Sequence, residues 1–207
     1  MSVKKDYIIP IVVLLFICLI VSGALAIVNS ITEPIIIEAA RERALEQKIS
    51  IMGEGIEFGD SEIEVFRSEP GFPRTISDIY RATNDAGFIF AISIRGYGRE
   101  NMRLLCGIDM NGRIIEPKTD NDTIAIVLSH TETVSFYNMV FNESHLGKFW
   151  GQDSAGIEGI DAITGATITS NALKYAMRDA LVAFEMVTAR DRSLRDFDLR
   201  DQEVYDE

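Results

Sequence analysis

The chain is organised around the stretch GIDAITGATITSN, which runs from Gly159 to Asn171. After it, apolar residues recur every three or four positions: Leu173, Ala176, Met177, Ala180, Leu181 and Phe184. This spacing predicts a helix with one apolar face that begins near Asn171. Four hydroxyl side chains lie where that helix begins: Thr164, Thr167, Thr169 and Ser170. The first turn of a helix has free N–H groups and the positive end of the helix dipole, so this place suits a phosphate group.

Ordinary helix capping accounts for the same residues. Ser, Thr and Asn are common N-cap residues, and a glycine before a helix is common in turns. Residue types and spacing alone therefore leave both interpretations open, capping and phosphate binding.

The segment from Asp161 to Ser170 resembles the flavinylation motif of the FMN-binding domain family. In that family the second Thr of a Ser/Thr-Gly-Ala-Thr unit carries FMN through a phosphoester bond. The resemblance implies that Thr167 is the attachment residue and that a separate flavin transferase attaches the FMN. It also implies cofactor contacts for the rest of the turn: Thr164, Gly165, Ala166, Ile168, Thr169 and Ser170.

Two segments further upstream are similar to the same family. Residues 96–98 read Gly-Tyr-Gly and precede a predicted strand, and residues 129–133 read Ser-His-Thr-Glu-Thr. The resemblance implies that four more side chains surround the flavin: Tyr97, His130, Glu132 and Thr133. Residue type alone leaves other roles open, namely core packing for Tyr97 and a solvent-exposed position for His130 and Glu132.

The composition argues against several classes of protein. The formal net charge is -12, whereas nucleic-acid binding needs a basic face, so we expect no nucleic-acid partner. The two cysteines are too few for an iron–sulfur cluster held by four thiolates, and the two histidines indicate no metal site. No Gly-x-Gly-x-x-Gly follows a predicted strand, which argues against a nicotinamide-binding half. If this protein carries electrons, an organic cofactor must hold them.

An uncharged run covers residues 7–28. At about 1.5 Å per residue, a helix of this length crosses a hydrocarbon core of about 30 Å. We expect an uncleaved single-pass anchor in the cytoplasmic (inner) membrane, although Ala24-Leu25-Ala26 also resembles a signal-peptide cleavage site. Lys4 and Lys5 precede the run, and the next basic residue is Arg41, which predicts a cytoplasmic N-terminus and an extracytoplasmic main domain.

The rest of the chain predicts an α+β fold. The expected parts are a cytoplasmic N-terminus (1–6), a transmembrane helix (7–28), a linker or stalk helix (29–50), an FMN-binding domain (51–188) and a charged tail (189–207). Residues 29–34 are expected to hold the cap of the stalk helix, followed by Pro34 early in that helix. Turn signals at 84–86 and 111–112 predict two hairpins, and hence a central, mostly antiparallel sheet with flanking helices.

The family resemblance extends over about residues 7 to 187. It is greatest to the flavoprotein subunits of Rnf-type ion-translocating complexes, and next to those of sodium-pumping quinone reductases. It implies an electron-carrying subunit that is no autonomous enzyme and acts with the other membrane subunits between ferredoxin and NAD. The alternative is a membrane-anchored extracytoplasmic sensing or binding domain, which would also have a membrane anchor, a negative net charge and an α+β fold. The Thr-Gly-Ala-Thr run separates the two interpretations, since a sensing domain has no need of it.

Overall fold

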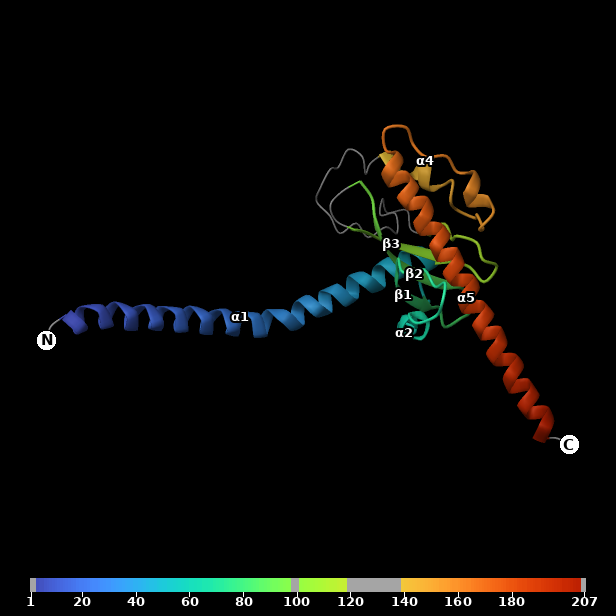
Figure 1. The fold of residues 1–207 in the computed structure, drawn as a ribbon. Helices are drawn as coiled ribbons and strands as arrows, with labels where there is room; N and C mark the ends of the chain where they lie inside the picture. Colours follow the sequence, from blue (N-terminus) through green and yellow to red (C-terminus); the bar gives the residue numbers. More distant parts are fainter. Residues whose placement is uncertain (1–2, 98–100, 119–138, 206–207) are drawn as a thin grey trace. The chain divides into compact units, whose positions relative to one another are not determined.

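The computed structural model describes residues 3–97, 101–118 and 139–205. The described elements are α1 (Val3–Met52), α2 (Ile63–Phe66), β1 (Ile76–Arg81), β2 (Phe88–Arg95), β3 (Asn101–Ile108), α4 (Glu143–Leu146), the 3-10 helix η1 (Gly156–Gly159) and α5 (Thr167–Tyr205) (Figure 1). The chain forms two compact units, Met1–Glu46 and Gln47–Glu207. The second unit holds the sheet and α5, so the expected α+β fold is confirmed.

The N-terminal helix α1 is one continuous element from Val3 to Met52. It is long and apolar enough to span a membrane, because mean hydropathy reaches 3.2 in an 18-residue window of its apolar part. None of that window is buried inside the protein. The helix is therefore a candidate membrane anchor, as the uncharged run predicts.

The helix does not restart at Asn29, so the expected cap is wrong, and Pro10 and Pro34 both lie inside α1. A proline has no N–H and leaves the carbonyl four residues earlier without its helical partner, which usually breaks a helix. Here the polar side chains bond within the helix instead of capping a new one. Ser30 Oγ donates to the Ile27 carbonyl and Thr32 Oγ1 to the Val28 carbonyl, both at 2.8 Å.

The sheet of the second unit has three described strands in the order β1-β2-β3, paired antiparallel. The hairpin predicted around residues 84–86 is confirmed, since it joins β1 to β2. The turn depends on left-handed backbone at Asp85 (φ 55°) and Gly87 (φ 141°). At Gly87 a β-carbon would lie 2.1 Å from the Ile108 carbonyl oxygen on β3, so only glycine fits there.

The second expected hairpin forms a turn but no further strand within the described residues. Asp109 Oδ1 accepts hydrogen bonds from the N–H groups of Asn111 and Arg113, which closes the turn. Only a single bridge, Ile108 to Ile114, pairs the returning chain with β3. Two backbone hydrogen bonds still join this segment to the end of β3, from the Asp109 N–H to the Arg113 carbonyl and from the Ile115 N–H to the Gly107 carbonyl. On its other side, Ile114 exchanges backbone hydrogen bonds with the 151–152 segment.

Helix α5 packs on the sheet, chiefly on β2 and β3 (Figure 1). All six apolar residues predicted to form its buried face are buried: Leu173, Ala176, Met177, Ala180, Leu181 and Phe184. The phenyl rings of Phe184 and Phe88 meet edge to face, with centroids 5.8 Å apart. The helix begins at Thr167, one turn before the predicted start, so it includes the second threonine of the motif.

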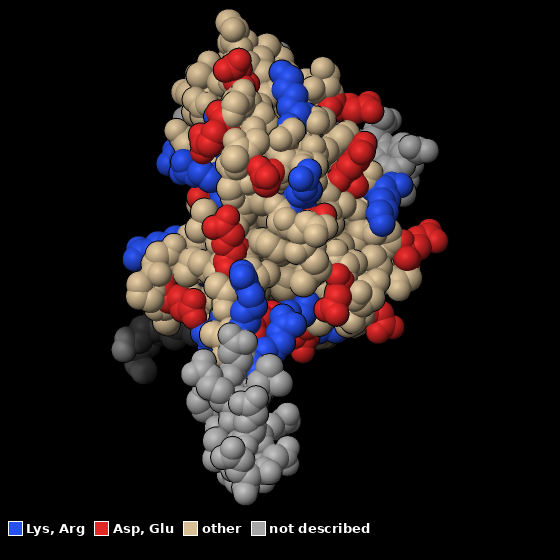
Figure 2. All heavy atoms as spheres, turned by 90° about the vertical axis from the view of Figure 1, so that its right-hand side faces the viewer, with Lys and Arg blue, Asp and Glu red and all other residues tan. Residues whose placement is uncertain are grey.

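The charged C-terminal segment continues α5 as a helix to Tyr205. Two ion pairs hold its beginning to the domain. Arg81 of β1 pairs with Asp191 at 2.7 Å, and Arg190 pairs with Glu69. Arg81 also pairs with Glu62 at 2.9 Å, which fixes the guanidinium within the domain. Figure 2 shows acidic and basic side chains interspersed over the face that it displays.

Candidate functional site

The Thr-Gly-Ala-Thr turn leads directly into α5. Its backbone is closed by a hydrogen bond from the Ala166 N–H to the Ile163 carbonyl, 3.1 Å long. Gly165 has φ 87°, a left-handed conformation that side chains rarely adopt. The segment that enters the turn is held from α5, because Lys174 Nζ donates to the carbonyls of Glu158 (2.6 Å) and Ile160 (3.3 Å). The turn is thus positioned from both sides.

The four hydroxyls of the motif fall into two classes. Thr169 and Ser170 are buried, with 3% and 2% of their surface exposed, whereas Thr164 and Thr167 are exposed. The buried pair is engaged in structural hydrogen bonds. Thr169 Oγ1 accepts from the Tyr97 N–H at 3.3 Å, and Ser170 Oγ accepts from the Ile163 N–H at 3.2 Å. Only the exposed pair is open to a reagent from solution.

Thr167 differs from Thr164 because it is the first residue of α5. Among the described residues, no backbone carbonyl accepts from the N–H groups of Thr167, Ile168 or Thr169. These donors and the helix dipole together suit an anion. The Thr167 hydroxyl itself makes one long contact, 3.4 Å to the Ile163 carbonyl. A phosphate bonded to this oxygen would lie next to the free donors, so the residues fit a phosphate group.

Apolar side chains lie exposed close to the turn. Ile168 is 58% exposed and follows the candidate attachment residue directly. The Met139 methyl carbon is 3.8 Å from the place that a β-carbon would take at Gly165. The hydrogen bond to Thr169 brings the backbone of Tyr97 beside the start of α5, and this tyrosine is 65% exposed. Exposed apolar and aromatic residues of this kind suit a planar aromatic ligand.

Residues 96–182 match the family model of the FMN-binding domain. This segment is an FMN-binding domain. The match includes Tyr97, β3, α4, the Thr-Gly-Ala-Thr turn and the first half of α5. It supports FMN as the cofactor and a flavin-binding electron-carrier role. No curated protein matches the chain.

The structure brings some of the predicted site residues of the FMN-binding domain together. Tyr97 lies beside the turn through its backbone hydrogen bond to Thr169. Ala166 is buried and Gly165 is exposed in the turn itself. His130, Glu132 and Thr133 lie outside the described residues, so their placement near the flavin stays a prediction.

His145 is the site residue that the sequence pattern does not reveal. Its imidazole is 3% exposed, and Nε2 lies 3.2 Å from Ser170 Oγ. The ring meets Phe149 edge to face at 5.6 Å. Within the described part of the chain, the buried Nδ1 has no hydrogen-bond partner. The one sequence signal for this part of the site is Asn142, a common N-cap residue that predicts the start of a helix three residues before His145. Its side chain caps α4 by accepting from the His145 N–H at 2.9 Å.

The pKa of His145 lies below its usual value, chiefly because burial disfavours the charged imidazolium and secondly because Lys148 is nearby. The unfolded chain then binds more protons than the folded one below about pH 6.5, so folding stability falls as the pH drops through this range. We expect the Tm of the wild type to fall more between pH 7 and pH 5 than that of His145→Gln, which cannot titrate. Thermal melts followed by Trp150 fluorescence check this, and equal falls would contradict it.

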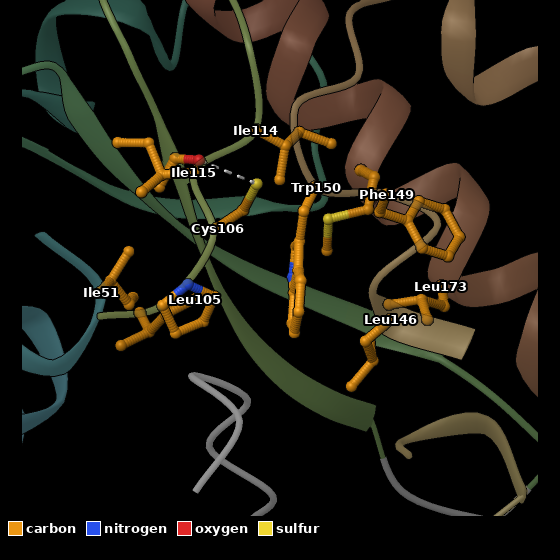
Figure 3. A pocket seen from close by; sticks show the side chains of 12 residues that line it. Ile51, Leu105, Cys106, Ile114, Ile115, Leu146, Phe149, Trp150 and Leu173 are labelled. Atoms are coloured by element: carbon orange, nitrogen blue, oxygen red, sulfur yellow. Dashed lines mark hydrogen bonds between the residues drawn. The ribbon is translucent and has the colours of Figure 1, made fainter. Parts of the chain in front are cut away.

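An apolar cavity lies between β3 and the buried side of α5 (Figure 3). Side chains from β3, from α5 and from the 146–150 segment line it, including Cys106, Trp150 and Leu173. Its volume is about 40 Å³, enough for a few waters at most, whereas pockets for drug-sized ligands measure about 300–1,000 Å³. The described cavity is therefore too small for a flavin ring.

Cys106 is no candidate for covalent chemistry. It is 3% exposed, and burial raises the pKa of its thiol to about 12, so it stays protonated and unreactive. No group of three or more potential metal-ligating side chains (His, Cys, Asp or Glu) occurs among the residues that the structure describes. Of the two exposed hydroxyls of the motif, that of Thr167 lies at the start of α5.

Proposed function

We propose that this chain is an electron-carrying flavoprotein subunit whose FMN is joined to Thr167 by a phosphoester bond. The observation that carries the proposal is the difference among the four hydroxyls of the motif. Thr169 and Ser170 are buried and hydrogen-bonded, and Thr164 lies in the turn, before the start of α5. Thr167 alone combines an exposed hydroxyl with the free N–H groups of the helix start.

The attachment requires an activated donor, because an alcohol and free FMN do not condense readily in water. A dinucleotide that contains FMN, such as FAD, meets this need. Thr167 Oγ1 forms a bond to the phosphorus of the FMN half, and the pyrophosphate bond of the donor breaks. AMP leaves, and the hydroxyl proton goes to a base of the flavin transferase. FMN then supplies one- and two-electron redox chemistry, while the protein positions it and keeps it from diffusing away.

The attachment is tested on the full chain, produced with and without a flavin transferase. We expect a mass increase of one FMN less one water only with the transferase, and yellow fluorescence that survives a denaturing gel. Peptide mapping should place the added mass on Thr167. A flavin on Thr164, or on none of the four hydroxyls, contradicts the assignment. A colourless wild type that purifies without multi-spanning partners would favour a sensing domain instead.

The membrane topology follows from the positive charges around the anchor. Lys4 and Lys5 precede the uncharged run, so the N-terminus is expected to stay in the cytoplasm. A tag inserted after residue 60 should then be accessible to protease from outside the cytoplasm in intact cells, while an N-terminal tag is protected. If the tag after residue 60 is protected instead, the main domain lies in the cytoplasm and the expected topology is wrong. A mature N-terminus at Ile27 would show that the helix is a cleaved signal peptide.

The subunit is proposed to act inside a larger membrane complex. An ion pathway needs polar groups sheltered between several helices, whereas residues 7–28 offer only Cys18 and Ser22 inside the run and Tyr7 at its end. Ion movement therefore belongs to partner subunits, and this flavin is an electron relay outside the membrane. By the motifs of its sequence the chain resembles RnfG, the flavoprotein subunit of a complex that passes electrons between ferredoxin and NAD and exports sodium ions or protons, and also NqrC of the sodium-pumping quinone reductase.

A further inference from the structure

A path of polar groups runs from the buried His145 to the Thr-Gly-Ala-Thr turn. His145 Nε2 lies 3.2 Å from Ser170 Oγ, and this oxygen accepts the Ile163 N–H, also at 3.2 Å. The carbonyl of Ile163 in turn accepts from the Ala166 N–H at 3.1 Å and from Thr167 Oγ1 at 3.4 Å. Hydrogen bonds on both sides of the Ile163 backbone thus link a buried imidazole to the candidate attachment hydroxyl.

The two ends of this path come from different elements. His145 lies on α4, and Ser170 lies in the first turn of α5. The imidazole has little freedom, because it is buried, meets Phe149 edge to face and belongs to a helix capped by Asn142. Ser170 Oγ can accept two hydrogen bonds and donate one, so it can serve Ile163 and His145 together in either neutral tautomer of the imidazole. The fixed imidazole of His145 therefore sets the orientation of the Ser170 hydroxyl.

We propose that His145 is a positioning residue for flavin attachment, which acts through Ser170 and Ile163 to hold the turn that presents the Thr167 hydroxyl. The inference rests on the proposed attachment to Thr167. Ile163 is held by Ser170 on its N–H side and itself holds Ala166 and Thr167 on its carbonyl side. Without the imidazole, the Ser170 hydroxyl can rotate to another orientation. The hydrogen bond from the Ile163 N–H to Ser170 Oγ is then lost, and the start of the Thr-Gly-Ala-Thr turn is no longer held. The Thr167 oxygen remains present but is misplaced for the transferase, and a small misplacement slows a reaction strongly.

The test compares the initial rate of FMN transfer to full-length variants by a purified flavin transferase with FAD, followed by intact mass. His145→Phe keeps a buried ring without hydrogen bonding, and Ser170→Ala removes the middle of the path. Each should lower the rate by about tenfold, the size expected when one buried hydrogen bond is lost. His145→Gln places an amide near the position of Nε2 and should restore the rate to within about threefold of the wild type. The matched control is Ser193→Ala, which also removes a serine of α5 with one side-chain hydrogen bond, and it should leave the rate unchanged.

The double variant His145→Phe/Ser170→Ala shows whether the two residues act along one path. Its rate should equal that of Ser170→Ala alone, since the second change then removes nothing further. Losses that multiply would mean independent roles and would overturn the proposal. A wild-type rate in His145→Phe would overturn it as well.

Amide exchange on the protein without flavin gives a readout that does not depend on attachment. Peptides covering residues 157–166 report the Ile163 N–H, which should exchange faster in His145→Phe and in Ser170→Ala but not in His145→Gln or Ser193→Ala. Unchanged exchange in His145→Phe overturns the proposal. If the wild type accepts no FMN on Thr167, the attachment itself fails, whereas the exchange result still decides whether His145 holds the turn.

Discussion

Membranes that contain Thr167→Val are expected to lose ferredoxin-dependent NAD reduction, down to the level of membranes that lack this subunit. Valine keeps the shape of threonine but has no hydroxyl, so the phosphoester cannot form. The hydroxyl makes only one long hydrogen bond, 3.4 Å to the Ile163 carbonyl, and the residue is exposed. The substitution should therefore cost little folding stability, and the partner subunits should still assemble.

The matched control is Thr188→Val, which removes a hydroxyl from the same helix. Thr188 Oγ1 donates to the Phe184 carbonyl at 2.8 Å, three turns or more beyond the motif. Membranes with this variant should keep their activity and their covalent flavin. Full activity with Thr167→Val and no bound flavin would show that the flavin is not on the electron path. Lost assembly would show instead that Thr167 has a structural role.

Gly87→Ala is expected to destabilise the second unit strongly. The residue has φ 141°, which alanine rarely adopts, and its β-carbon would lie 2.1 Å from the Ile108 carbonyl oxygen. The neighbouring strand is backbone and cannot move without breaking the β2–β3 ladder, which pairs Phe88 with Ile108. We expect the free energy of unfolding to fall by about 3–5 kcal/mol, in the range of the most damaging point mutations.

Gly59→Ala is the control for this substitution. A β-carbon at Gly59 meets nothing within 4 Å, and the backbone there is not left-handed. Denaturant titrations of both variants, with Trp150 as the probe, should show a large loss for Gly87→Ala and almost none for Gly59→Ala. Covalent flavin should fall together with the folded fraction, because the turn needs α5 docked on the sheet. A wild-type midpoint for Gly87→Ala would contradict the close approach of β2 and β3.

Local patterns in the sequence determined the main elements. The spacing of Leu173, Ala176 and Met177 predicts the buried face of α5 correctly, since helical periodicity places these residues on one side whatever they pack against. The hairpin around Asp85 is equally local, because Asn, Asp and Gly tolerate the left-handed conformation that its turn requires. The uncharged run of residues 7–28 and the Thr-Gly-Ala-Thr motif are also properties of neighbouring residues.

Two other features were not predicted, one because nearby residues bond differently and one because distant residues meet in the fold. The cap expected in residues 29–34 is wrong, since Ser30 and Thr32 satisfy carbonyls inside α1. The second hairpin ends early because Ile114 pairs with residues 151–152, which only the folded chain brings near. Patterns of neighbouring residue types do not show which other carbonyl or N–H group a residue will bond in the folded chain.

The sequence by itself determined that four hydroxyls stand at the start of a helix, and it identified the family through them. Only the tertiary structure decided which of the four are available. Burial against the 96–97 segment and α4 engages Thr169 and Ser170, while Thr167 remains exposed. His145 enters the site for the same reason, because its distance from Ser170 is set by packing and not by spacing along the chain. Hydroxyls only a few residues apart thus differ in role, since a helix turns their side chains toward different surroundings.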